Sequence, residues 1–159
     1  MADTLILGVG NSLMGDDAIG VLVAQQLQLR RDLPPDVDVI DGGTDGIGLI
    51  PVMERYRRVF VVDAVPMGLA PGTIRRFTWA DVRLVGGEKM LSLHQSDFTE
   101  ALLLAETLRC LPAEVIIYGV EPQQMAWDAP VSLPVEQARL TLIDNLLQEL
   151  NNAQKNSAY

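Results

Sequence analysis

The sequence predicts an α/β fold of three layers, in which a mostly parallel sheet of about five strands lies between helices. Two observations carry this prediction. Short apolar runs of strand-forming residues, such as TLILGV at 4–9 and VFVVD at 59–63, have the length and composition of buried parallel strands. Segments with a helical spacing of apolar residues alternate with these runs, so helical connections join successive strands.

Local signals place the individual elements. Alternating residues followed by Gly42-Gly43 predict a second strand at 37–41, and alternation at 72–77 is typical of an edge strand. Ser132 is a cap residue with a proline two positions later, which predicts the start of the last helix. In chain order we expect strands at residues 4–9, 37–41, 59–63, 72–77 and 115–120, helices at 17–31, 45–56, 96–109 and 132–150, and a long loop at 78–95.

Length and composition indicate a single folded domain. The chain has 159 residues, of which 48% are hydrophobic and 21% charged, and this excludes a disordered chain. At roughly 150 residues per domain, this length corresponds to one domain. We assign residues 1–150 to one α/β domain and the polar residues 151–159 to a C-terminal tail that frays.

The charge balance argues against nucleic acid as a partner. Asp and Glu outnumber Lys and Arg by 21 to 12, which gives a net charge of −9. The single cysteine, Cys110, excludes an internal disulfide and a cysteine zinc site. The first apolar run is too short for a signal peptide, and no run approaches the roughly 18 apolar residues of a membrane span. We therefore expect a cytoplasmic protein without membrane insertion, and we expect a monomer.

Acidic residues gather where ligands bind in such sheets, beyond the carboxyl ends of the strands. Asp16 and Asp17 follow the first strand, Asp41 ends the second and Asp63 ends the third. A turn-forming role explains Asp41 equally well, and a helix cap explains one of the first two acids but not both. A carboxylate at the end of a buried strand such as Asp63 is usually paired, bound to a metal or shifted in pKa.

His94 is the only histidine, and it precedes the helix expected at 96–109. Most lone histidines bind no ligand, but two carboxylates and one imidazole together make a mixed site for a divalent transition metal. None of the usual zinc-ligand spacings is present. The chain also lacks a Gly-x-Ser-x-Gly motif, which excludes a serine hydrolase with that nucleophile.

A nucleotide-binding module is an alternative from a different class. The segment GVGN at residues 8–11 opens like a dinucleotide fingerprint, although the third glycine is Gly15 rather than residue 13. Asp41 is suitably placed for a ribose. However, Asp16 and Asp17 lie where the pyrophosphate would meet the helix N-terminus, and their charges would repel it.

The segment GVGNSLMGDDAIG at residues 8–20 resembles the opening of the [NiFe]-hydrogenase maturation endopeptidases. The resemblance extends over nearly the whole chain, and residues 89–104 are most similar to the subgroup that serves membrane-bound uptake hydrogenases. The other matching motifs, in the same order as in that family, are DGGT at 41–44, VDA at 62–64, PGT at 71–73, SLHQ at 92–95 and GVEP at 119–122.

This resemblance implies a twisted, mainly parallel sheet and an enzyme that removes a short C-terminal extension from the precursor of a hydrogenase large subunit after nickel insertion. It also implies that Asp17, Asp63 and His94 are the catalytic and metal-contacting residues, with Asp16 and Asp41 as possible supporting residues. The first acid is often Glu in the family. Because Asp17 is one methylene shorter, Asp16 is a candidate to share its role.

Nickel, in this interpretation, is supplied by the precursor, because three protein ligands leave coordination positions open. Other divalent metals are expected to occupy such a site in vitro. Two roles for the metal stay open, activation of the attacking water or recognition of a finished substrate by an enzyme whose base is an Asp. A nickel-binding chaperone that docks the precursor without cutting it is the alternative function, and it would use the same three residues.

Overall fold

A computed structural model describes residues 2–84 and 97–157, and its sheet confirms the predicted fold class. The strand order is β2-β1-β3-β5-β4; β4 is antiparallel to β5 at one edge and the other pairs are parallel. The strands are β1 (Thr4–Val9), β2 (Val37–Gly43), β3 (Arg58–Ala64), β4 (Ile74–Thr78) and β5 (Glu114–Val120). The helices are the 3-10 helices η1 (Gly15–Ala18) and η2 (Gly46–Leu49), and α1 (Ile19–Gln28), α2 (Ile50–Met53), α3 (Trp79–Leu84), α4 (Asp97–Thr107) and α5 (Leu133–Ser157).

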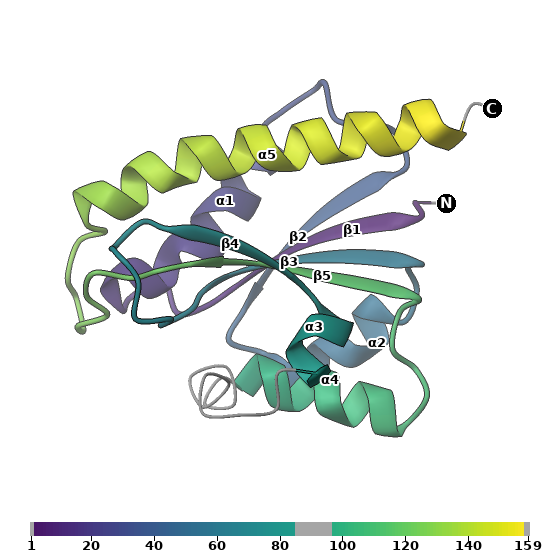
Figure 1. Ribbon diagram of the computed structural model, residues 1–159, viewed down its shortest axis with the longest axis horizontal. Helices are drawn as coiled ribbons and strands as arrows, with labels where there is room; N and C mark the ends of the chain where they lie inside the picture. Colours follow the sequence, from purple (N-terminus) through teal and green to yellow (C-terminus); the bar gives the residue numbers. More distant parts are fainter. Residues whose placement is uncertain (1, 85–96, 158–159) are drawn as a thin grey trace.

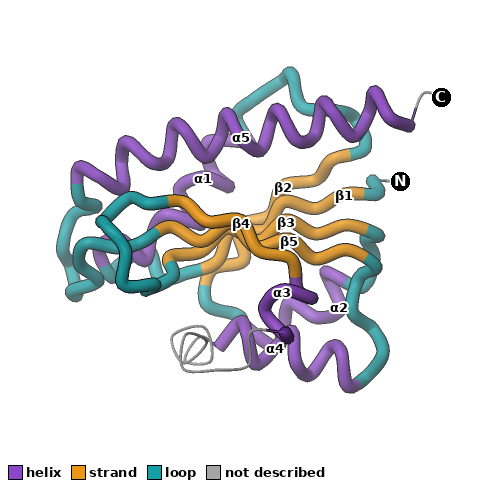
Figure 2. The backbone as a smooth tube through the Cα atoms, in the orientation of Figure 1, coloured by secondary structure: helices purple, strands orange, loops and turns teal. Residues whose placement is uncertain are grey.

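Helices cover both faces of the sheet, as Figures 1 and 2 show. α1 and α5 lie on one face, and α2, α3 and α4 lie on the other. Successive residues of β1 alternate between the two resulting cores: Leu5 and Leu7 pack with the side of α2–α4, and Ile6 packs with α1 and α5. All three side chains are fully buried, so the central strands are apolar on both faces, as a sandwiched parallel sheet requires.

The prediction of a long loop at 78–95 is wrong for residues 79–84, because Trp79–Leu84 form the helix α3. The Asp81 carboxylate accepts a hydrogen bond from the backbone N–H of Thr78 at 2.9 Å, and the Thr78 hydroxyl accepts one from the N–H of Asp81 at 3.1 Å. This reciprocal pair is a capping box, a signal that is readable in the sequence. Trp79 is buried in the core and anchors the helix there. Residues 85–95 lie outside the described part of the chain.

The polar residues after position 150 also differ from expectation. α5 continues to Ser157, so residues 151–157 are helical instead of forming a frayed tail. The Gln154 side chain donates a hydrogen bond to Asp36 at 3.2 Å, which ties these last turns to the segment before β2. Although α5 is long, no helix among the described residues is apolar enough over a sufficient length to cross a membrane.

Glu149 joins α5 to the sheet through two partners. Arg76 of β4 donates to its carboxylate at 2.5 and 3.1 Å, and the hydroxyl of Tyr118 on β5 donates to the other oxygen. Burial and the bond to Glu149 raise the pKa of Tyr118 to about 12. Burial alone would raise the pKa of Glu149, but hydrogen bonds from Arg76 and Tyr118 lower it below its ordinary value. The ionised carboxylate therefore stabilises the fold.

We predict that Glu149→Gln lowers the free energy of unfolding by about 2 kcal/mol near neutral pH, because hydrogen bonds to a charged group are lost. The pKa of Glu149 is depressed in the folded state, so its contribution is present above the unfolded-state pKa of about 4.3 and disappears as the pH falls through the folded-state pKa. Urea unfolding across this range measures the difference. Asp144→Asn, at an exposed position of the same helix, is the control. A difference that persists unchanged in acid would contradict this role.

Candidate functional site

α1 begins directly against the carboxyl ends of β1 and β3. A Cβ atom at Gly20 would lie 2.2 Å from the carbonyl oxygen of Val62 and 2.3 Å from that of Val9, so only glycine fits there. Gly10 has φ +134°, and a Cβ at this position would lie 2.1 Å from the carbonyl oxygen of Asp17. The turn after β1 therefore folds back onto η1 and brings Asp17 to the ends of the two central strands.

The Asp17 carboxylate is partly exposed and fixed by a short-range contact. Its Oδ2 accepts a hydrogen bond from the backbone N–H of Asn11 at 2.8 Å. Burial raises the pKa of Asp17 above its ordinary value, and the bond from Asn11 offsets only part of this effect. One oxygen is thus oriented by the turn, in an environment that disfavours the negative charge.

Asp63 is the second-last residue of β3, which contacts η1; the residue is partly exposed, but protein surrounds its carboxylate. Its pKa is well above the ordinary value, first because of burial and second because of the negative charge of Asp17; a hydrogen bond from the backbone N–H of Ala64 acts in the opposite direction. Because η1 contacts β3, the elements that carry Asp17 and Asp63 are adjacent. No arginine or lysine among the described residues forms an ion pair with either. The pair is therefore suited to take up a proton or a cation.

Asp16 has a different environment from its neighbour. It is fully buried, and its carboxylate accepts hydrogen bonds from the backbone N–H groups of Gln123, Gln124 and Ser132 at 2.8, 3.1 and 2.7 Å, and from the Ser132 hydroxyl at 2.8 Å. Burial by itself would raise the pKa of Asp16, but these four donors lower it below its ordinary value. Both oxygens of Asp16 accept hydrogen bonds that tie η1 to the loop between β5 and α5, and a role of Asp16 beside Asp17 stays a prediction.

The expected helix cap is also wrong. The N-cap positions of η1 and α1 are Met14 and Ala18, and neither helix has a side-chain cap hydrogen bond. Asp16 and Asp17 lie inside η1. Asp17 accepts the N–H of Asn11 from the preceding turn, and Asp16 accepts the N–H of Gln123 from a distant loop, so neither carboxylate caps a helix.

Asp41 forms a turn at the end of β2. Its Oδ1 accepts a hydrogen bond from the N–H of Gly43 at 3.0 Å, and its Oδ2 accepts one from the Gln25 side chain of α1 at 3.1 Å. The first contact is the turn-forming interaction weighed from the sequence. The Asp41 side chain is exposed. It lies at the same edge of the sheet as Asp17, because the carbonyl oxygen of Gly43 accepts a hydrogen bond from the N–H of Gly10 at 2.9 Å, and Gly10 belongs to the turn that leads to Asp17. A role for Asp41 toward a substrate stays a prediction.

His94 lies outside the described residues, so the structure does not place it. Within residues 2–84 and 97–157 there is no group of three His, Cys, Asp or Glu side chains that could hold a metal ion. The described part of the chain thus contributes two of the three predicted ligands, Asp17 and Asp63. The metal-binding role of all three residues stays a prediction.

Glu121 is a buried carboxylate that the sequence analysis named only as part of the GVEP motif at 119–122, without a role of its own. Its Oε2 accepts a hydrogen bond from the backbone N–H of Met67 at 2.5 Å, and its backbone bonds to Gly72 and Thr73. These contacts hold the loop that follows Asp63. Glu121 comes directly after a buried strand, which is the signal that drew attention to Asp63, so the same signal would have found it.

The nucleotide-binding alternative does not fit this arrangement. A phosphate at the first turn needs free backbone N–H groups. The N–H of Asn11 is already bonded to the Asp17 carboxylate, and the space beside Gly10 is filled by the backbone of Asp17.

Comparison with known proteins assigns the family. A family model described as HycI, hydrogenase maturation protease, matches residues 21–149. The chain belongs to the hydrogenase maturation protease family. It is an endopeptidase of this kind, as the motifs at residues 8–20 and 119–122 predict.

Individual relatives agree with this assignment. The hydrogenase expression/formation protein HupD of Bradyrhizobium diazoefficiens is 33% identical over 147 residues, which are 92% of this chain and 77% of that protein. HoxM of Cupriavidus necator, which has the same description, is 38% identical over 119 residues, which are 75% of this chain and 59% of HoxM. The solved structure of the E. coli hydrogenase maturating endopeptidase HybD superposes with a TM-score of 0.81 at 28% identity and covers 96% of this chain and 94% of its own.

We predict that Asp16→Asn destabilises the maturation protease by about 3 kcal/mol near neutral pH, because an amide nitrogen would face backbone donors and the charge-assisted bonds would be lost. Since the pKa of Asp16 is depressed, its stabilising effect should fade as the pH falls through the folded-state value. Asp128→Asn is the matched control. Asp128 is exposed in the loop between β5 and α5, the loop that supplies the donors to Asp16, and its φ of 57° is one that Asn also tolerates. Equal unfolding midpoints for the two variants would contradict the proposal that the Asp16 carboxylate holds η1 to the loop between β5 and α5.

We predict the opposite effect for Asp63→Asn, a gain on the order of 1 kcal/mol near neutral pH. The pKa of Asp63 is raised, so wild-type stability declines as the pH rises from the unfolded-state pKa of about 3.9 toward the folded-state value. The amide carries no charge and retains an oxygen for the Ala64 N–H. Thermal unfolding of both proteins over this pH range measures the gain, which should vanish in acid. A lower stability of the variant at neutral pH would show that the ionised carboxylate is not strained.

Proposed function

We propose that this maturation protease cuts the C-terminal extension from the large-subunit precursor of a [NiFe]-hydrogenase after nickel has been inserted. The family supports an endopeptidase, and the names of its relatives connect that activity with hydrogenase formation. The observation that carries the proposal is the pair Asp17 and Asp63, two partly exposed residues on the adjacent elements η1 and β3 at the carboxyl edge of the sheet. Peptide hydrolysis needs such groups where a substrate can reach them.

Nickel belongs to the substrate in this proposal. Asp17, Asp63 and His94 contact the nickel that the precursor already carries, and two carboxylates with one imidazole suit a divalent transition metal. The structural support is electrostatic: the charges of Asp17 and Asp63 oppose each other, and no described cation pairs with them. A divalent ion brought by the precursor offsets this repulsion, so a precursor with its metal binds better than one without.

Two routes supply the nucleophile from these residues. A divalent metal lowers the pKa of a bound water. Alternatively, Asp63 takes the proton of the attacking water, because its raised pKa brings it closer to neutrality than an ordinary Asp. In either route the Asn11 N–H fixes one oxygen of Asp17, and Asp41 orients the substrate from the neighbouring strand β2.

The proposed site needs only one copy of the chain, because Asp17 and Asp63 belong to the same protomer. We therefore propose that a monomer acts on the precursor in the cytoplasm.

A cleavage assay with nickel-loaded precursor tests the function, with the shortened large subunit followed on a gel. We expect the rate to fall by roughly 100-fold or more for Asp17→Asn, Asp63→Asn and His94→Ala. Asp17→Glu should retain cleavage, because it restores a carboxylate with one more methylene of reach. Asp144→Asn, on the exposed side of α5, serves as the control for charge removal away from the site.

The same assay separates the alternatives. A folded Asp63→Asn protein, verified by circular dichroism, that cleaves at the normal rate would contradict the proposed site. Precursor that binds wild-type protein but is never shortened would instead support the nickel-binding chaperone. Equal cleavage of metal-free and nickel-loaded precursor would contradict recognition of the metal and leave a purely carboxylate-based protease.

A further inference from the structure

Three large apolar side chains lie exposed close to Asp17. Leu13, Met125 and Trp127 are 54%, 37% and 66% exposed, and we call them the apolar rim. Leu13 belongs to the turn that carries Asp17, and the other two belong to the loop between β5 and α5. Exposed tryptophan in a folded protein is uncommon and is enriched at binding surfaces.

The backbone beneath the apolar rim is held in place. The N–H of Asp128 donates to the carbonyl oxygen of Leu13 at 2.7 Å, and the N–H of Asp16 donates to that of Gln124 at 2.9 Å. The Gln124 side chain donates to Pro130 at 2.6 Å and accepts from the N–H of Ala126 at 3.1 Å, which closes the loop on itself. These contacts join the two segments into one preorganised surface, and this lowers the ordering cost of binding.

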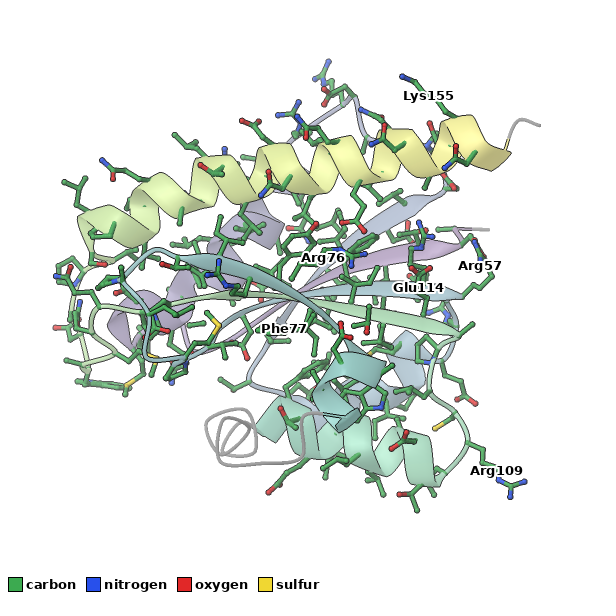
Figure 3. All side chains as sticks on the ribbon, in the orientation of Figure 1. Arg57, Arg76, Phe77, Arg109, Glu114 and Lys155 are labelled. Carbon is green, nitrogen blue, oxygen red and sulfur yellow. The ribbon has the colours of Figure 1, made fainter. Side chains whose placement is uncertain are left out.

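Charge around the apolar rim has a single sign. Residues 10–18 and 121–132 contain four acids and no lysine or arginine, and Asp63 adds a fifth carboxylate at the same edge. Asp16 and Glu121 are buried, so Asp128, which is exposed, and Asp17, which is partly exposed, provide the accessible carboxylates of these two segments. Of the cations labelled in Figure 3, Arg57, Arg109 and Lys155 lie toward the opposite side of the molecule, and Arg76 lies near the middle, where it pairs with Glu149.

We propose that the apolar rim docks a segment of the precursor that carries apolar side chains together with lysine or arginine. This inference rests on the proposed function and adds the chemistry of the substrate segment. The apolar side chains of that segment cover Trp127, Leu13 and Met125, and its cations approach Asp128 and the site carboxylates. A second copy of this chain does not fit, because a two-fold contact would place the two acidic edges against each other.

Cleavage kinetics with nickel-loaded precursor test the docking. Trp127→Ser and Leu13→Ser should each raise KM by roughly 10-fold with little change in kcat, because binding at the rim is equal in ground and transition states. Leu140→Ser is the matched control, since Leu140 is 59% exposed on α5, outside both segments. Raising the salt concentration should raise KM for wild type, and Asp128→Asn should weaken this salt dependence. Unchanged KM in both rim variants would overturn the proposal.

A binding measurement keeps this inference separate from catalysis. The chain has two tryptophans, Trp79, which is 6% exposed, and Trp127, which is 66% exposed, so acrylamide quenching of tryptophan fluorescence reports mainly on Trp127. Nickel-loaded precursor should protect this fluorescence, and precursor with the lysines and arginines of its C-terminal region changed to glutamine should protect it less. Protection without cleavage would refute the proposed protease activity but support the docking. Cleavage without protection would refute the docking alone.

Discussion

The enclosed carboxylate of Asp16 is the interaction on which the candidate site depends. A buried charge is costly unless donors surround it, and here three backbone N–H groups and one hydroxyl do so. These donors all come from the loop between β5 and α5, more than 100 residues away in the chain. The same contact therefore fixes η1, which carries Asp17, and the loop that carries the apolar rim.

Three aspartates at one edge of the sheet have different properties because their surroundings differ. The hydrogen bonds to Asp16 lower its pKa by more than burial raises it, so its pKa is depressed and its charge stabilises the fold. Asp17 has one donor, and Asp63 has one donor and a negative neighbour, so the pKa of each is raised. Asp16 thus stabilises the fold, whereas the raised pKa values of Asp17 and Asp63 mark them as candidates for the functional site.

Close approach between backbones makes this edge possible. Gly20 lets α1 start against Val9 and Val62, and Gly10 lets the turn fold back onto Asp17. The Asp17 carboxylate accepts the hydrogen bond of the Asn11 N–H. The glycine-rich segment that resembles a nucleotide-binding loop is therefore occupied by a carboxylate of the chain itself. A short apolar strand followed by glycines therefore does not by itself indicate a phosphate site.

The sequence by itself determined the strand and helix order, the edge position of β4 and the acids at the strand ends, because periodicity and turn residues act locally. Its motifs also identified the family. The tertiary structure decided what each acid does: a four-donor enclosure for Asp16, a shared charge for Asp17 and Asp63, and a turn for Asp41. α3 was missed although its capping box is local, and the helical end of α5 is supported by Gln154 and Asp36, which are distant in the chain. The roles of the acids could not be predicted from the sequence, because the burial and pKa of a side chain depend on partners that are distant in the chain and meet only in the fold.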